Sequence, residues 1–155
     1  MELPAEPTPI EIGRGEVLAA GERVALVGYG NGVQIGLSAA HMLKEHGIAP
    51  TVCDARFAKP LDADLLSSLA ADHELLVTIE ENVLAGGFGS AVLEHLSDSA
   101  SVRGTLPHIV RFGVPDRYVT HGSPDLLRAE VGLTPERVTA AVIEAMDRPR
   151  ALRSA

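Results

Sequence analysis

The chain has 155 residues, of which 46% are hydrophobic and only 3% aromatic, and this predicts a single domain with an aliphatic core. Its formal net charge of −8 argues against a nucleic-acid surface, because such surfaces use Lys and Arg to neutralise phosphates. Cys53 is the only cysteine, which excludes an intramolecular disulfide and suits a reducing compartment. No apolar run is long enough to span a membrane, so we expect a cytoplasmic location.

The first part of the chain predicts a linker followed by the start of an α/β pattern. Residues 1–9 hold three prolines among Glu and Thr, which is typical of an extended linker. Residues 10–18 alternate weakly and contain two glycines, which predicts a short edge strand or a bulged ribbon. An all-apolar strand at 24–27 then leads through a glycine-rich turn into a helix at 33–45.

The middle of the chain repeats the order of a strand followed by a helix. The predicted elements are a strand at 49–54, a helix at 63–71, a strand at 75–79, a helix at 90–96 and a strand at 109–112. Asp62 is a candidate N-cap of the first of these helices. Because the strands are continuous apolar runs, typical of burial on both faces, we expect an α/β fold with a mostly parallel sheet covered by helices.

The last part of the chain is predicted to be helical. Ser123-Pro124-Asp125 and Thr134-Pro135-Glu136 each combine a capping residue, a proline at the first helical position and an acidic residue in the first turn. Residues 147–155 contain three arginines and a proline, and we expect them to form a flexible tail. The packed domain is therefore expected to span residues 10–146.

The turn Gly28-Tyr29-Gly30-Asn31-Gly32 follows a strand and has some likeness to a dinucleotide-binding turn. The spacing G-x-G-x-x-G would require glycine at position 33 or at position 35, which are occupied by Val33 and Ile35. We therefore interpret this turn as the close packing of a strand against a helix, and we do not expect it to bind NAD.

A second glycine-rich turn, Gly86-Gly87-Phe88-Gly89-Ser90, follows the strand that ends in Glu80 and Glu81. Amides at the start of a helix can bind a carboxylate or a phosphate, but glycines also let a neighbouring backbone approach closely, and we favour close packing. Glu80 and Glu81 point to opposite sides of an extended strand, so they do not form an acid–base pair. We expect one to reach a partner domain and the other to be solvated.

The six histidines do not show the H-E-x-x-H motif or any other spacing typical of metal ligands. His121 is the best candidate among them for a chemical role, because it lies in a polar segment just after a strand. We interpret it nevertheless as a loop histidine that bonds to backbone. The sequence therefore predicts no metal site.

Five segments carry a resemblance to a known family. They are LVGYG at 26–30, DARFAKPLD at 54–62, VTIEEN at 77–82, GGFGS at 86–90 and VPDRY at 114–118. In this order they resemble the carboxy-terminal domain of the 1-deoxy-D-xylulose-5-phosphate synthase family, over about residues 10–146. The segment at 54–62 is the most specific, because the related 2-oxo acid dehydrogenase β subunits and transketolases carry other residues there.

The resemblance implies a fold and a parent enzyme. The fold is a three-layer α/β/α sandwich with a mostly parallel sheet of about five strands and an antiparallel edge strand, as in transketolase C-terminal domains. The parent is a homodimer that uses thiamine diphosphate and magnesium to condense pyruvate with glyceraldehyde 3-phosphate, in the non-mevalonate route to isoprenoids. The family's cofactor and metal motifs lie in its amino-terminal and middle domains. The resemblance thus implies no catalytic, cofactor-binding or metal-binding residue in this chain.

The resemblance also implies that this domain packs against the amino-terminal and middle domains, dimerises and frames the active site. Candidates for these contacts are Asp54, Arg56, Lys59, Glu80, Glu81, Gly86, Gly87, Gly89, Asp116, Arg117 and His121. An alternative prediction for some of them, Arg56 and Lys59 in particular, is that they make local contacts within their own turn. Two other functions remain open, namely a partner-docking domain of a 2-oxo acid dehydrogenase β subunit and a free-standing nucleotide-binding α/β enzyme.

Overall fold

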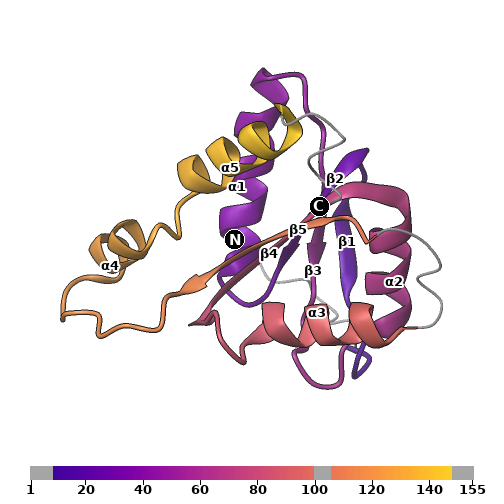
Figure 1. Ribbon diagram of the computed structural model, residues 1–155, viewed down its shortest axis with the longest axis horizontal. Coiled ribbons are helices and arrows are strands. Elements are labelled where there is room, and N and C mark those ends of the chain that lie inside the picture. Colours follow the sequence, from indigo (N-terminus) through magenta and orange to yellow (C-terminus); the bar gives the residue numbers. More distant parts are fainter. Residues whose placement is uncertain (1–8, 100–105, 148–155) are drawn as a thin grey trace.

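The computed structural model describes residues 9–99 and 106–147, which form one five-stranded sheet with helices on both faces (Figure 1). The strands are β1 (Glu16–Ala19), β2 (Arg23–Gly28), β3 (Thr51–Asp54), β4 (His73–Val83) and β5 (His108–Val114). Their order across the sheet is β1-β3-β2-β4-β5. β1 is antiparallel to β3 and the other four strands are parallel, so the predicted sheet is confirmed.

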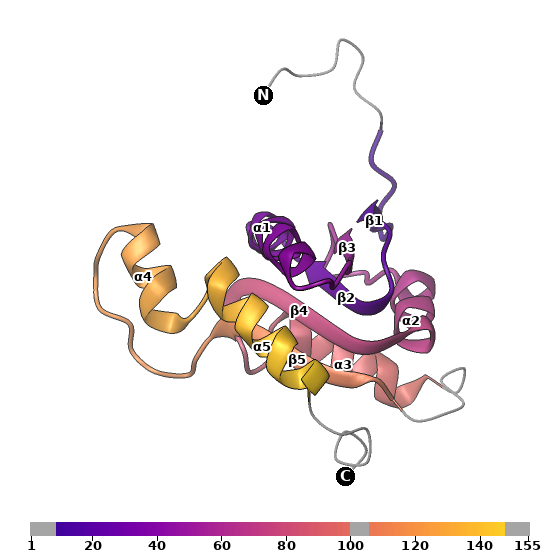
Figure 2. The same cartoon turned by 90° about the horizontal axis from the view of Figure 1, so that it is seen from above.

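The helices divide between the two faces of the sheet. They are α1 (Gly32–Glu45), α2 (Ala63–Asp72), α3 (Phe88–Asp98), α4 (Pro124–Val131) and α5 (Pro135–Asp147). α1 and α5 share one apolar core with alternate residues of β2 and β4, whereas α2 and α3 pack on the opposite face. The three-layer α/β/α sandwich is therefore confirmed, with α4 projecting away from it (Figures 1 and 2).

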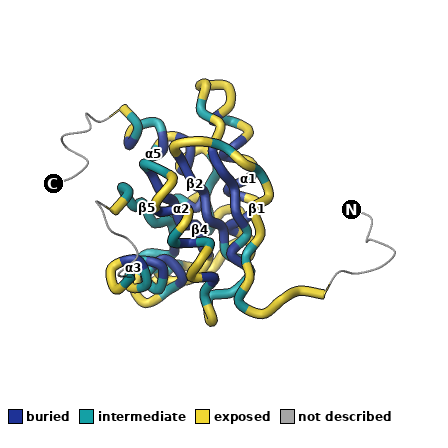
Figure 3. The backbone as a smooth tube through the Cα atoms, turned by 90° about the vertical axis from the view of Figure 1, so that its right-hand side faces the viewer, coloured by how far each residue is buried: buried dark blue, intermediate teal, exposed yellow. Residues whose placement is uncertain are grey.

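The core lies around the central strands β2 and β4, as expected from their continuous apolar sequences. Residues 24–28 of β2 and 75–80 of β4 are all buried, and buried backbone is concentrated in these strands (Figure 3). Side chains alternate across a strand, so each of these strands supplies apolar side chains to both helical layers. Leu26 and Val77 face α1 and α5, and Val27 and Leu76 face α2 and α3.

The helix starts follow the sequence signals for capping. The Asp62 carboxylate accepts a hydrogen bond from the Leu65 amide at 3.1 Å, as predicted for an N-cap of α2. The Thr134 hydroxyl accepts one from the Arg137 amide at 3.3 Å at the start of α5. Ser123 occupies the N-cap position of α4, but its side chain makes no capping hydrogen bond there.

The predicted edge strand at 10–18 is too long. Only residues from Glu16 onward pair with β3, whereas residues 11–14 form a turn closed by a hydrogen bond from the Arg14 amide to the Glu11 carbonyl. The buried carboxylate of Asp62 holds the end of this turn, since it accepts a hydrogen bond from the Gly15 amide at 3.0 Å and pairs with Arg14 at 3.4 Å. The strand therefore starts only after the turn.

The predicted strand at 75–79 is too short, because β4 continues to Val83 and pairs there with β5. Most of the predicted linker and tail, residues 1–8 and 148–155, lie outside the described residues. The one described tail residue, Asp147, belongs to α5. Among the helices of the described residues, none is long and apolar enough to cross a membrane.

Close packing at the start of α1 gives a first prediction, that Gly32→Ala destabilises the fold by about 1–3 kcal/mol. A Cβ on Gly32 would overlap the carbonyl oxygen of Ile79, and this oxygen belongs to the central strand β4 and accepts a hydrogen bond from the Tyr29 amide. Gly36→Ala is the matched control in the same helix, because its Cβ would meet the Ile79 Cδ1 at an ordinary 3.5 Å.

Chemical denaturation of both variants measures the difference. We expect Gly36→Ala to equal or exceed the parent, since alanine favours helices by about 1 kcal/mol over glycine. Equal loss of stability in the two variants would contradict the packing described for the turn at 28–32.

Candidate functional site

The carboxyl ends of β2, β3, β4 and β5 meet at one edge of the sheet because these strands are parallel. Ligands and partners of open α/β sheets bind outside this edge, which we call the carboxyl edge. All the contact candidates predicted from the sequence lie there, in the last residues of β3 and β4, in the segments that follow β3, β4 and β5, and at the start of α3. The segment after β5 leaves this edge toward α4 (Figure 1).

Glu80 is the most constrained residue of the carboxyl edge. Its side chain is completely buried, and its carboxylate accepts hydrogen bonds from the amides of Phe88 and Gly89, both at 2.7 Å. These amides belong to the first turn of α3, where the helix dipole also favours a negative charge. Glu80 therefore lies inside the domain, and the expectation that its side chain meets a partner domain or solvent is wrong.

The glycine-rich turn at 86–90 wraps around this carboxylate. A Cβ on Gly87 would overlap the Val83 carbonyl oxygen and the Glu80 carboxylate, and a Cβ on Gly89 would lie 2.6 Å from the Thr78 hydroxyl oxygen. Close packing, the favoured interpretation, is thus confirmed for these two glycines. The amides of the turn do bind a carboxylate, but it is the chain's own. Gly86 differs from its neighbours, since it is exposed with a positive φ of 76°.

A second group of polar contacts closes the loop between β4 and α3. The Ser90 hydroxyl donates to the Leu84 carbonyl at 2.8 Å and accepts from the Gly86 amide at 3.0 Å. Arg111 of β5 donates to the same carbonyl and the same hydroxyl, each at 2.9 Å. The loop is therefore tied to both the helix that follows it and the neighbouring strand.

Glu81 points away from Glu80, as predicted, but it is not simply solvated. One carboxylate oxygen accepts from the Asn31 amide group at 2.6 Å, and the other pairs with Arg128 of α4 at 2.5 Å. Partial burial opposes ionisation of this carboxylate, but the hydrogen bonds from Arg128 and Asn31 outweigh it and lower the pKa of Glu81. Glu81 thus joins three segments that are far apart in the sequence.

A crevice lies at the switch point between β2 and β4, where the chain order across the sheet reverses. It has a volume of about 330 Å³ and is lined by Tyr29, Gly30, Asn31, Glu81 and Asn82. The Tyr29 ring stacks on Phe88 of α3, with 5.4 Å between the ring centroids. An open crevice with a carboxylate in its wall is poorly suited to an anionic ligand.

A neighbouring crevice of about 580 Å³ shares Tyr29, Gly30 and Asn31 and extends to Arg56 and to Ile10. Arg56 forms an ion pair with Glu16 of β1, and its amide donates to the Asp54 carboxylate at 2.8 Å.

The remaining sequence candidates of the carboxyl edge differ in their contacts. Asp54 and Arg56 make local turn contacts, which is one of the two roles predicted for this segment. Arg117 pairs with Glu130 at 3.3 Å, whereas Asp116, His121 and Lys59 are exposed. Sequence reasoning missed Asn31 and Arg128, because nothing in their local pattern indicates that Glu81 is their shared partner.

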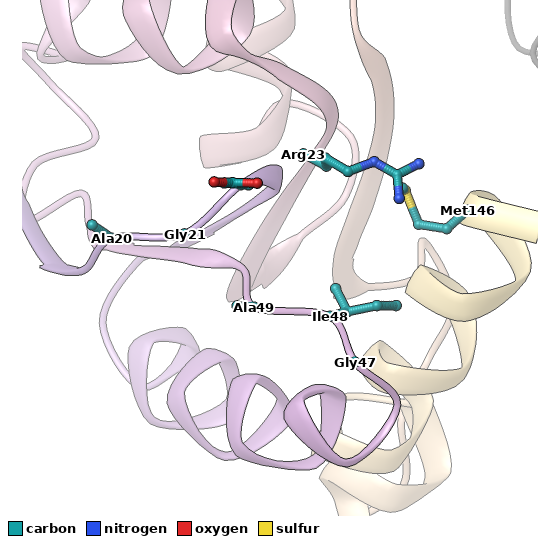
Figure 4. A pocket seen from close by; sticks show the side chains of 8 residues that line it. Ala20, Gly21, Arg23, Gly47, Ile48, Ala49 and Met146 are labelled. Carbon is teal, nitrogen blue, oxygen red and sulfur yellow. The ribbon is translucent and has the colours of Figure 1, made fainter.

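The potential metal ligands and the single thiol are the other groups in the described residues that could carry chemistry. Within residues 9–99 and 106–147, no three His, Cys, Asp or Glu side chains are grouped so that they could hold a metal ion. Burial raises the pKa of the Cys53 thiol to about 11, so this cysteine is unreactive at neutral pH. At the opposite edge of the sheet, a pocket of about 360 Å³ has Arg23 and Met146 at its rim (Figure 4). It contains none of the residues predicted from the sequence.

The structure is an α/β/α domain in which the amides of the turn at 86–90 already bind a carboxylate of the same chain, that of Glu80. Comparison with known proteins identifies this class of domain. Residues 13–138 match the family described as the transketolase C-terminal domain, and the chain belongs to this family.

Similar proteins are synthases and a transketolase. The chain is 52% identical over 142 residues to a probable 1-deoxy-D-xylulose-5-phosphate synthase 2, chloroplastic, from Oryza sativa subsp. japonica, covering 92% of this chain and 20% of that protein. It is 45% identical to the 1-deoxy-D-xylulose-5-phosphate synthase of Thermosynechococcus vestitus, covering 92% and 22%. Among solved structures, "Split gene transketolase, inactive beta4 tetramer" matches with a TM-score of 0.79 and 39% identity, covering 88% of this chain and 43% of that one.

These coverages set the scale of the comparison. The chain spans about a fifth of the length of the synthases that it matches. The similarity therefore identifies one domain and does not extend to the rest of those proteins.

The packing of the glycine turn predicts that Gly87→Val and Gly89→Val destabilise the fold more than Glu81→Ala does. Each valine would displace backbone or buried side chains, at about 1–3 kcal/mol. Loss of the partly exposed Glu81 ion pair costs less than about 1 kcal/mol. Thermal melts of the three variants test the order, and equal melting temperatures would show that the glycines are not packed as described.

The buried carboxylate gives a third prediction, that Glu80→Gln lowers stability by about 1–3 kcal/mol. Glutamine keeps the shape of the side chain, but its NH₂ group would face a backbone amide as a second donor and leave that amide unpaired. Glu81→Gln is the matched control at the adjacent position, with an expected change of less than about 1 kcal/mol. Urea denaturation measures both changes. An unchanged free energy of unfolding for Glu80→Gln would show that Glu80 does not cap α3.

Proposed function

We propose that this chain is the carboxy-terminal domain of a 1-deoxy-D-xylulose-5-phosphate synthase. The observation that carries the proposal is the 52% identity to the rice protein of that name across 92% of this chain. The parent would be a transferase of the transketolase type that condenses pyruvate with glyceraldehyde 3-phosphate to form an isoprenoid precursor. Its cofactors would be thiamine diphosphate and magnesium, and its assembly a homodimer.

Within such a parent, the domain would have a structural role and would frame the active site. The described residues do not fit a diphosphate, because the amides at the start of α3 already bind Glu80, and Glu81 places a carboxylate in the wall of the crevice at the switch point. Adjacent Glu80 and Glu81 side chains engage different partners, so they do not act together on a proton. Binding of the cofactor and the reaction itself would therefore belong to the amino-terminal and middle domains.

The alternative of a nucleotide-binding enzyme loses support from the turn at 28–32. Amides there bond within the turn, with the Gly32 amide donating to the Tyr29 carbonyl at 3.2 Å and the Val33 amide to the Gly30 carbonyl at 3.1 Å. A phosphate cradle needs amides that point at the ligand. The alternative of a dehydrogenase docking domain loses support from the synthase names of the similar proteins.

Contacts with the preceding domains would use the exposed part of the carboxyl edge. Asp116, Arg117, His121, Lys59 and Gly86 remain available for this role, because they lie at the surface. A reducing compartment such as the cytoplasm would suit the free thiol of the chain.

The proposal predicts that this chain alone neither binds thiamine diphosphate with micromolar affinity nor consumes pyruvate in the presence of glyceraldehyde 3-phosphate. Calorimetry with magnesium and the cofactor measures the first, and a coupled pyruvate assay measures the second. The full parent polypeptide should be active in the same assay, and deletion of residues 10–146 should abolish that activity. Micromolar binding or steady product formation by the chain alone would contradict the proposal, as would a parent polypeptide without this activity.

A further inference from the structure

Residues 115–131, which we call the arm, contain no buried residue. The arm comprises the segment after β5 and the helix α4, none of whose residues is buried. It carries two large apolar side chains that face solvent, Tyr118 at 88% exposure and Leu126 at 70%. Figures 1 and 2 show it projecting from the sandwich. Exposed aromatic and aliphatic side chains on a projecting element are typical of docking surfaces.

The arm is held in place by polar contacts. Arg128 joins α4 to Glu81 of β4 at 2.5 Å, whereas its pair with Asp125 at 3.0 Å and the pair of Arg117 with Glu130 at 3.3 Å lie within the arm. Gly132, in the left-handed region with a φ of 76°, ends α4 where the chain turns back to the domain. An exposed element that is already ordered loses less conformational entropy when its apolar side chains bind a partner.

The topology places the preceding polypeptide at the same edge of the sheet. Because β1 is antiparallel to β3, its first residue, Glu16, pairs with the last residue of β3, Asp54. The segment before β1 therefore lies at the carboxyl edge, and Ile10 lines the crevice there together with Tyr29 and Arg56. The described chain therefore enters the domain at this edge.

The crevice and the arm form one continuous surface. Gly30 and Asn31 line both crevices of the carboxyl edge, and Asn31 bonds the Glu81 carboxylate that also holds Arg128 of the arm. Ile10 is itself 61% exposed, so the surface has apolar side chains at both of its ends. A partner domain that covers this surface from Ile10 onward would reach the arm.

We propose that the arm docks onto the polypeptide that precedes residue 9 in the parent synthase, with Tyr118 and Leu126 as its apolar anchors. The inference rests on the proposed function, because it requires a parent of which this chain is the carboxy-terminal domain. About four fifths of the length of the similar synthases lies outside the matched region, and the matched family is a carboxy-terminal domain. That upstream polypeptide and the arm share one edge of the sheet.

Photo-crosslinking in the full parent polypeptide identifies what the arm contacts. Tyr118 is replaced by benzoylphenylalanine, which keeps an aromatic ring at this position and leaves the domain core unchanged. The matched control carries the same replacement at Leu18, which is exposed on the edge strand β1. We expect the Tyr118 variant to give a crosslink that maps upstream of residue 9, and in higher yield than the Leu18 variant.

Hydrogen exchange of the unmodified proteins gives an independent measurement. We expect the amides of α4 to exchange at least about tenfold more slowly in the parent than in this chain alone, because docking must be broken before they open. Leu126→Ser in the parent should remove most of that protection.

Two results would overturn the inference. One is a crosslink that maps within residues 10–146, which would assign the arm to this domain or to a second copy of it, and the other is equal exchange in parent and chain. Pyruvate consumption by the same unmodified parent separates the two proposals. An inactive parent would contradict the proposed function. An active parent in which the α4 amides exchange as fast as in this chain alone would contradict only this inference.

Discussion

The carboxyl edge of this domain depends on one buried carboxylate. Glu80 lies at 0% exposure between the sheet and α3 and accepts two amide hydrogen bonds of 2.7 Å. A buried charge is stable only when its hydrogen bonds are satisfied, so the first turn of α3 must stay within reach of it. The glycines at 87 and 89 follow from this, since side chains there would fill the space that the carboxylate and its neighbours occupy. The ring of Phe88 is thereby directed into the core, where Tyr29 stacks on it.

The same interaction decides what the edge can do. A helix start with free amides is an anion-binding site, but here the chain supplies the anion itself. The adjacent Glu81 is used differently, as the anchor for Asn31 and for Arg128 of α4. One glutamate thus stabilises the interior and the next one fixes a projecting element. The carboxyl edge is therefore organised to hold backbone and to present a surface, and this agrees with a domain that supports a larger enzyme.

Local sequence patterns predicted the sheet, its covering helices and the Asp62 cap, because apolar runs and capping residues act over a few neighbouring positions. They placed the start of β1 too early, since the turn at 11–14 depends on Asp62, about fifty residues away. The sequence also suggested that the turn at 86–90 could bind a carboxylate. It did not indicate that Glu80 was that carboxylate, or that Arg128 reached Glu81, because both pairings depend on how distant segments pack.

Amide hydrogen exchange at single residues tests the central claim most directly. In this chain, NMR can follow the amides of Phe88 and Gly89 in the presence and absence of inorganic phosphate. The account predicts that both exchange as slowly as the buried amides of β4, and that phosphate changes neither their rates nor their chemical shifts, because Glu80 already accepts their hydrogens. Fast exchange, or saturable shifts with added phosphate, would show a free anion site and contradict the account.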